Sequence, residues 1–281
     1  MASTSPARAR WGDLGVRALS AMVLIPAVLL DVWVGGIWFT LMVALIAVLM
    51  AQEWTAMAHR QNPLQFALHA AAAMAGALLP LEAGVMAATA AICILWAISA
   101  ALARLHDPRP AIWPYLGVPY AGVPAMALVL LCNDQVYGLT VIAWILAIVW
   151  AADSLAYFAG RIIGGPKLAP RLSPNKTWAG LGGAIAGSAL ASAVFAAAAG
   201  LEGVFVLAAV AGLLAIVEQA GDLFKSALKR HYGVKDSGHL IPGHGGIIDR
   251  VDGLVAVATA SALIGALRSG FDVTGQGILS W

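Results

Sequence analysis

The stretch VIAWILAIVWAADSLAYFAG (141–160) contains a single charged residue, Asp153, among side chains that are mostly apolar or small. A run of about 20 such residues is long enough to cross the hydrocarbon core of a bilayer as an α-helix. Comparable runs recur along the 281-residue chain, which is 61% hydrophobic and 11% charged and has a mean hydropathy of +0.87. Because soluble domains carry about 25% charged residues, this composition predicts an all-α polytopic membrane protein.

The spacing of these runs predicts nine transmembrane helices. The expected spans are 16–34, 36–52, 65–81, 83–103, 112–132, 138–159, 178–199, 203–222 and 253–269. The first of them follows a basic N-terminus, as in a signal peptide. No clear small-residue cleavage site comes after it, so we interpret it as an uncleaved first helix.

The positive charges predict how these helices are oriented. Short cytoplasmic loops of membrane proteins are enriched in Lys and Arg. With nine spans and a cytoplasmic N-terminus, 15 of the 16 Lys and Arg fall on the cytoplasmic side and only Arg268 falls on the other. We therefore expect a multi-pass protein of the cell (inner or plasma) membrane, with its C-terminus on the side opposite the cytoplasm.

Polar chemistry is concentrated in the second half of the chain. Two predicted cytoplasmic loops, 160–178 and 223–253, hold most of the charged residues of that half. We therefore divide the chain into an N-terminal scaffold of about five helices (1–137) and a C-terminal catalytic domain of about four helices (138–281).

Composition also argues against two kinds of function. The net charge is only +2, so the chain has no broad basic face for nucleic acid. Cys93 and Cys132 lie in or beside apolar spans and lack the spacing of metal ligands, so we interpret them as packing residues.

Several carboxylates are expected near the cytoplasmic ends of the helices. Glu218 and Asp222 are four residues apart and share one face of a helix, while Asp249 and Asp252 begin the last span. Asp222 and Asp249 lie at the two ends of one loop, and folding that loop back would bring them together. Carboxylate oxygens suit Mg²⁺. The structural alternatives are snorkelling to the membrane surface and acidic residues that complement a helix N-terminus.

Basic and glycine-rich segments accompany these acids. SPNKT (173–177) is expected to form a turn before a helix, whose N-terminus would favour an anion. PGHGG (242–246) would free backbone N–H groups for phosphate oxygens. The neighbouring cations are Lys167, Arg171, Lys176, Lys229, Arg230, Lys235 and Arg250.

The mixture of charges indicates a reaction class. Each cation alone is explained by membrane topology or by contact with anionic lipids, but this does not explain the interleaved carboxylates and glycines. The combination predicts phosphoryl or nucleotidyl transfer to a membrane substrate. A GxxxxGK[ST] loop is absent from the sequence, which excludes an ordinary P-loop ATPase. For His239 and His244 we favour contacts with phosphate or backbone over metal ligation.

The segment SALKRHYGVKDSGHLIPGHGGIIDRVD (226–252) closely resembles the signature of the phosphatidate cytidylyltransferases, also called CDP-diacylglycerol synthases. The fixed positions of that signature are S, K-R, K-D, P-G-H-G-G and D-R-x-D, and all are filled here. The segment 153–180 resembles a second region of the family. It departs from the pattern at Asn175, where Lys is common, and at Ala179, where Glu is common.

This resemblance implies that CTP and phosphatidic acid give CDP-diacylglycerol and pyrophosphate. It implies a requirement for Mg²⁺ at Asp222 and Asp249, with K⁺ as a candidate second ion, and we add Glu218 and Asp252 as candidate metal ligands. The expected catalytic residues are Asp222, Asp249, Lys229, Arg230, Lys235, Asp236 and Arg250. The expected substrate-binding residues are Asp153, Lys167, Arg171, Ser173, Asn175, Lys176, Thr177, Ser226, His244, Gly245 and Gly246.

The active site is expected to face the cytoplasm, where CTP is found, and a homodimer is a candidate assembly. Two alternative functions remain open from the residues alone. One is a CTP-dependent lipid or polyprenol kinase. The other is an ion-coupled transporter that would use Asp153, Glu218 and Asp222 as coupling carboxylates.

Overall fold

The structure is a computed structural model that describes residues 22–23, 25–106, 112–238, 240 and 245–281. Within these residues, eight helices are long and apolar enough to cross a membrane. They are α2 (Gly36–Ala58), α3 (Pro63–Glu82), α4 (Gly84–His106), α5 (Trp113–Cys132), α6 (Gly138–Ile162), α7 (Trp178–Ala198), α8 (Val204–His231) and α9 (Ile248–Ser269). The predicted all-α polytopic architecture is therefore confirmed.

The first expected span, 16–34, lies partly outside the described residues. Its described part includes a short apolar helix, Ile25–Val34. After α9, the chain ends in a short helix, α10 (Thr274–Leu279), which packs against α9.

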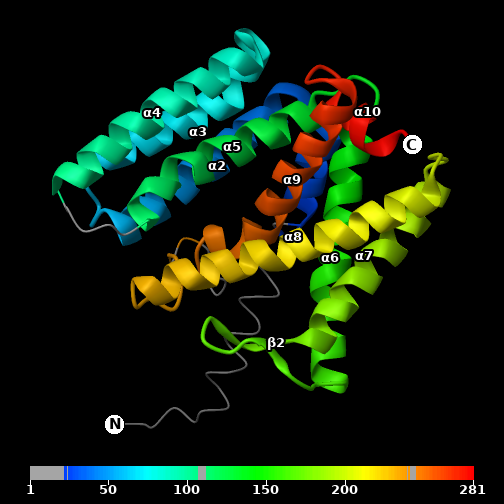
Figure 1. Cartoon of the computed structure of the whole chain (residues 1–281). Coiled ribbons are helices and arrows are strands. Elements are labelled where there is room, and N and C mark those ends of the chain that lie inside the picture. The colour runs from blue at the N-terminus through cyan, green and yellow to red at the C-terminus, as the bar shows by residue number, and fades with distance from the viewer. Residues whose placement is uncertain (1–21, 24, 107–111, 239, 241–244) are drawn as a thin grey trace.

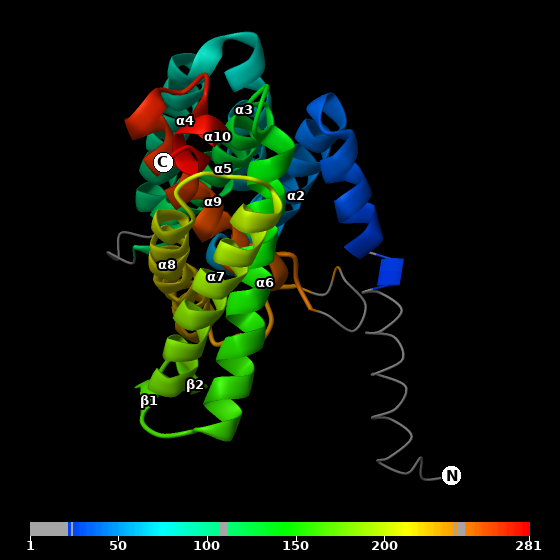
Figure 2. The same ribbon diagram turned by 90° about the vertical axis from the view of Figure 1, so that its right-hand side faces the viewer.

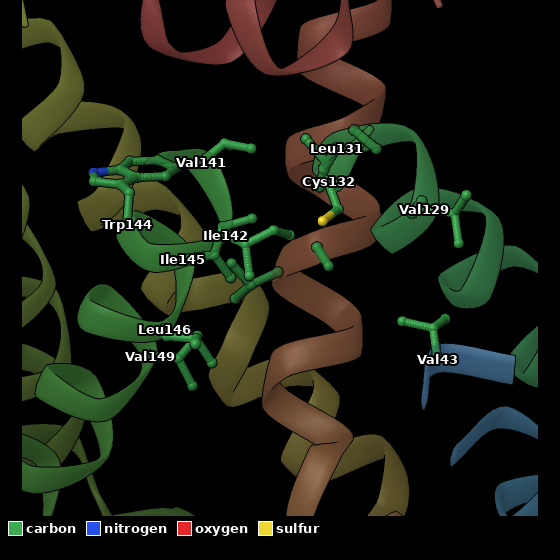
Figure 3. Packing of buried hydrophobic residues seen from close by; sticks show 14 of the residues in the cluster. Val43, Val129, Leu131, Cys132, Val141, Ile142, Trp144, Ile145, Leu146 and Val149 are labelled. Atoms are coloured by element: carbon green, nitrogen blue, oxygen red, sulfur yellow. The ribbon is translucent and has the colours of Figure 1, made fainter. Parts of the chain in front are cut away.

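The helices form two groups that share one hydrophobic core (Figure 1). Helices α2 to α5 pack against one another, and α6, α7, α8 and α9 pack as consecutive neighbours. Helix α9 joins the groups because it contacts both α5 and α6. Figure 3 shows Val129 of α5 and Ile145 of α6 on opposite sides of the α9 ribbon. Cys132 is a buried packing residue, as expected, whereas Cys93 lies on the outer surface.

A β-hairpin follows α6 at the end of the α6–α7 pair (Figure 2). Its strands are β1 (Lys167–Ala169) and β2 (Ser173–Thr177), which are antiparallel and pair Lys167 with Thr177. The prediction of a turn at 173–177 was wrong, because this segment finds backbone partners in β1. The prediction of a helix directly after it is confirmed. Thr177 is the N-cap of α7, and its Oγ1 accepts a hydrogen bond of 3.0 Å from the Gly180 N–H.

Helix α8 continues through His231, past the expected end of its span at 222. The segment 223–231 contains neither Gly nor Pro, and its last turn carries Lys229 and Arg230, which favour a helix C-terminus. The helix ends before Gly233, which has a φ of +68°. With 28 residues α8 is about 42 Å long, so its polar end extends beyond a hydrocarbon core of about 30 Å.

Candidate functional site

Four elements bring charged side chains to one place near the hairpin. Helix α6 supplies Asp153, strand β2 supplies Lys176, and the polar end of α8 supplies Asp222. The start of α9 packs beside α8 (Figure 1) and supplies Asp249 from its first turn and Asp252 from the next. Because α8 extends so far, its acidic and basic residues lie along a rigid helix rather than in a loop.

The side chain of Lys225 lies at the centre of these acids. Its Nζ is 2.7 Å from Asp222 Oδ1 and 2.8 Å from Asp252 Oδ2. The same Nζ is 3.9 Å from Asp249 Oδ1. Lys225 is 8% exposed and is thus almost fully enclosed. The structure therefore brings Asp222 and Asp249 to the same cluster, as the folding back of their loop would require.

Two further lysines complete the ion-pair network. Lys176 Nζ is 2.6 Å from Asp222 Oδ2 and donates a hydrogen bond of 2.6 Å to Gln219 Oε1. Lys229 Nζ is 2.5 Å from Asp249 Oδ1. Each oxygen of Asp222 therefore faces an ammonium group. Such pairing offsets the cost of burying several carboxylates together.

The carboxylates surround a polar cavity of about 180 Å³, which we call the acidic cavity. Its charged lining residues are Asp153, Glu218, Asp222, Lys225, Asp249, Arg250 and Asp252. These oxygen donors are of the kind that Mg²⁺ prefers, so the residues fit this ion chemically. Within the described part of the chain, no group of three or more acidic, His or Cys side chains is already arranged around a metal position.

A larger cavity of about 480 Å³ adjoins the first, and we call it the lateral cavity. Asp153 and Asp222 line both cavities. Its other lining residues include Tyr157 and Arg161, and an Arg161 N–H donates a hydrogen bond of 2.7 Å to the Tyr157 hydroxyl. Tyr157 and Phe158 are exposed on the outward face of α6. This cavity therefore lies beside a surface suited to lipid.

A third cavity of about 180 Å³, the basic cavity, lies between the hairpin and the end of α8. It is lined by Leu172, Ser173, Pro174, Asn175, Ser226, Lys229, Arg230, Val234 and Lys235. Asn175 also lines the lateral cavity. The lateral cavity therefore shares lining residues with each of the other two. The acidic and basic cavities share none, but Lys229 of the basic cavity is paired with Asp249 of the acidic cavity.

Most of the predicted site residues line one of these cavities, but some do not. Three predicted residues are exposed and line none of the cavities described above. They are Lys167 and Arg171 of the hairpin and Asp236. Gly246 is buried against Ser237 rather than open to a ligand. His239 and His244 lie outside the described residues.

Three residues that line the cavities were missed by the sequence analysis, namely Lys225, Gln219 and Arg161, and so was the buried Glu53, which lies outside them. Lys225 and Gln219 lie three residues from Asp222 on α8, so helical spacing was a usable signal for both. Arg161 looked like an ordinary topology-setting cation. Glu53 lies in α2, and its only signal was a carboxylate within an apolar span.

These features define a class of protein. A polytopic helical membrane protein that encloses acidic, basic and lipid-adjacent cavities at one end of its helices is built to act on phosphate groups at a membrane surface. Residues 15–267 match the model of the Cytidylyltransferase family, and the chain belongs to that family.

Named relatives resemble this chain over most of its length. It is 45% identical to the phosphatidate cytidylyltransferase of Brucella abortus over 267 residues, which cover 93% of this chain and 96% of the relative. It is 34% identical to the phosphatidate cytidylyltransferase of Haemophilus influenzae over 277 residues, which cover 85% and 94%. A shorter match, 44% identical over 126 residues, links it to the phosphatidate cytidylyltransferase of Bacillus subtilis and covers 44% of this chain and 47% of the relative.

Proposed function

We propose that this protein is a phosphatidate cytidylyltransferase. A phosphate oxygen of phosphatidic acid attacks the α-phosphorus of CTP, the bond to the β-phosphate oxygen breaks, and CDP-diacylglycerol and pyrophosphate are formed. The observation that carries this proposal is the position of the acidic cavity, which shares walls with a lipid-adjacent cavity and is linked to a basic cavity through Lys229.

The chemistry of this reaction matches the residues available. The second pKa of a phosphate monoester is about 6, so the attacking oxygen is largely ionised at neutral pH and no strong general base is needed. The main obstacle is the repulsion between a lipid phosphate and a triphosphate. Cations that hold both in line for attack lower that barrier.

The lateral cavity is suited to the lipid phosphate. Arg161 and Lys176 provide positive charge there, and Tyr157 orients the Arg161 guanidinium. The exposed Tyr157 and Phe158 lie on the same helix, so acyl chains could remain in the bilayer while the head group enters. Arginine and lysine both bind phosphate oxygens through charge-assisted hydrogen bonds.

The basic cavity is suited to the triphosphate of CTP. Lys229, Arg230 and Lys235 surround it, and Ser226 adds a hydroxyl group. The Arg230 Nε lies 3.5 Å from the Leu172 carbonyl oxygen of the hairpin. This contact keeps Arg230 directed toward the hairpin, where Asn175 separates the two substrate cavities.

The acidic cavity is suited to a divalent cation between the two substrates. Asp222, Asp249 and Asp252 are its proposed ligands, and a lysine ammonium would have to give way on binding. Mg²⁺ there would offset the charge of the transferring phosphate and the leaving pyrophosphate. Lys225 holds Asp222 and Asp252 on facing helices and keeps both turned inward.

The site is proposed to face the cytoplasm. Short cytoplasmic loops of membrane proteins are enriched in Lys and Arg. The end of the molecule that holds the site is rich in such residues, namely Arg161, Lys176, Lys229, Arg230 and Lys235. CTP would then reach the basic cavity directly from water.

The test uses purified protein in detergent with phosphatidic acid, Mg²⁺ and CTP labelled at the α-phosphate. Label is expected in the lipid phase and is expected to disappear with EDTA. Transfer of label from γ-labelled CTP to an alcohol lipid, with no lipid label from α-labelled CTP, would instead establish a lipid kinase. Absence of both products from folded protein would contradict the proposal.

A further inference from the structure

Glu53 is a buried carboxylate in the N-terminal half of the chain. It lies in α2, among residues that are mostly apolar, and is only 3% exposed. A carboxylate in such a position is costly unless hydrogen-bond donors surround it. Among the described residues, the hydrogen-bond donors to Glu53 come from the segment before α9 and from the first residue of that helix.

Both carboxylate oxygens of Glu53 are hydrogen-bonded to this distant segment. Oε1 accepts a bond of 2.7 Å from the Ile247 N–H, and Oε2 accepts one of 3.0 Å from the Ile248 N–H. The Ser237 hydroxyl also lies 2.8 Å from Oε2. Glu53 therefore holds together two points, Ser237 and Ile247, that are ten residues apart in the chain.

These bonds cap the helix that carries the site acids. Ile247 and Ile248 are the N-cap and first residue of α9, and the apolar side chain of Ile247 cannot accept from the free N–H groups. Glu53 accepts instead, and its negative charge complements the positive end of the helix dipole. Asp249 and Asp252 lie in the first turns of this helix, so the cap fixes where they point.

Ser237 links Glu53 directly to Asp249. The Ser237 N–H donates a bond of 2.8 Å to Asp249 Oδ2, and the hydroxyl oxygen lies 2.9 Å from the same atom. The other oxygen of Asp249 contacts Lys229. Both carboxylate oxygens of Asp249 are therefore held, one by Lys229 and one by Ser237. The position of Ser237 in turn depends on its contact with Glu53.

Two glycines of the segment leave room for this arrangement. A Cβ atom at Gly238 would lie 2.5 Å from Glu53 Oε1. A Cβ atom at Gly246 would lie 2.1 Å from Ser237 Oγ and 2.5 Å from Glu53 Oε2. Gly246 thus allows close approach to Glu53, which differs from the phosphate contact that its motif suggested.

We propose that Glu53 is a positioning residue for the active site, which clamps Ser237 and the first turn of α9 and thereby orients Asp249 toward Lys229. This inference rests on the proposed function for its kinetic readout. It makes the N-terminal helices part of the active-site architecture, although no group from them touches the cavities described above.

The first experiment compares Glu53→Gln with the wild-type protein. The amide keeps the size of the side chain. However, one carboxylate oxygen is replaced by an NH₂ group, which cannot accept a hydrogen bond from the N–H and hydroxyl donors around it. We expect kcat to fall about 10- to 100-fold, as for other groups that orient a ligand-bearing side chain. The KM for phosphatidic acid should stay within about twofold, because Arg161 and Lys176, the cations proposed for its phosphate, are held by Tyr157 and Gln219 instead. Glu53→Asp, which retains the charge, should recover part of the loss.

Glu82→Gln is the matched control, since Glu82 is an exposed carboxylate of the same half and should leave kcat unchanged. Ser237→Ala should lower kcat by itself. The double variant Glu53→Gln/Ser237→Ala should lose less activity than the product of the two single losses, because both changes break the shared contact between Glu53 and the Ser237 hydroxyl. Additive losses, or a Glu53→Gln variant with full kcat, would overturn the proposal.

A second measurement does not depend on catalysis. Hydrogen–deuterium exchange in the Glu53→Gln variant should become faster at the start of α9 and remain unchanged in α6. If exchange at the start of α9 were the same in the variant as in the wild type, the proposed role of Glu53 would be contradicted even if activity were lost. Wild-type protein assayed in parallel tests the proposed function separately, since failure of the wild type to label lipid would not depend on Glu53.

Discussion

The ammonium group of Lys225 lies between carboxylates of two helices and is almost completely enclosed. Removing one member of a buried ion pair costs about 3–5 kcal/mol, because the other charge is left without a partner. We therefore expect Lys225→Met to lower the melting temperature of the protein in EDTA. Mg²⁺ should restore part of this loss, because the freed oxygens of Asp222 and Asp252 are suited to the ion.

Thermal denaturation in detergent, with and without Mg²⁺, measures this effect. Lys235→Met is the control, since Lys235 is exposed and belongs to the basic cavity. A Lys225→Met variant with an unchanged melting temperature in EDTA would contradict the central role given to this ammonium group.

Asp222 and Asp249 should be essential for the reaction itself. Asp222→Asn and Asp249→Asn are each expected to lower the rate of lipid labelling at least about 100-fold, the usual scale for loss of one key electrostatic group. Both variants should still elute from gel filtration as folded protein, because the amides fill the same space. Cys93→Ser is the control and should retain activity, since Cys93 lies on the outer surface. An active Asp222→Asn variant would exclude this carboxylate as a metal ligand.

The sequence predicted part of this residue cluster, and chain geometry explains the part that it missed. Asp222 and Asp249 were found because they lie toward the two ends of one predicted cytoplasmic loop, which would bring them together by folding back, and because the family resemblance implies a metal site there. Lys225 was missed because a lysine near the cytoplasmic end of a helix is also expected from membrane topology alone, so it gave no separate signal of a site. Glu53 precedes Ser237 by 184 positions, and only the packing of α2 against the segment before α9 brings them together.

At the scale of elements, α6 and α8 divide the proposed substrates between them. The end of α6 carries Arg161 in the lateral cavity, whereas the end of α8 carries Lys229 and Arg230 in the basic cavity. Arg161→Gln should therefore raise the KM for phosphatidic acid about tenfold, since a hydrogen bond to a charged group contributes about 1.5–3 kcal/mol. The KM for CTP should remain unchanged.

Arg230→Gln should give the opposite result, with a higher KM for CTP and an unchanged KM for phosphatidic acid. Initial rates measured while each substrate is varied in mixed micelles separate the two constants. If Arg161→Gln raised the KM for CTP instead, the assignment of the two cavities would have to be exchanged.

The elements themselves were predicted unevenly. Apolar runs located the eight described spans because helix length is set by bilayer thickness. The hairpin was missed because the strand character of 173–177 comes from pairing with β1, which local sequence does not encode. The end of α8 was placed too early because its polar residues were interpreted as a loop, although the segment 223–231 contains neither Gly nor Pro.

At the scale of the whole molecule, the site depends on both halves of the chain. The main buried cluster contains Val43 from α2, Ile145 from α6 and Val257 from α9, so the first half is packed into the same core as the second. Glu53 then reaches from that core to the start of α9. A fragment that began at α6 would lack this support.

The orientation of the whole molecule decides whether CTP can reach the basic cavity, and it can be tested by chemical labelling. Single cysteines are introduced by Lys235→Cys at the site end and by Glu202→Cys in the connection between α7 and α8, both at exposed positions, in a background with Cys93→Ser and Cys132→Ser. The predicted nine-span orientation places 15 of the 16 Lys and Arg on the cytoplasmic side, so a membrane-impermeant maleimide should label Glu202→Cys in intact cells. Lys235→Cys should react only in inverted vesicles. The reverse pattern would separate the site from cytoplasmic CTP, and the proposed reaction could not then proceed in the cell.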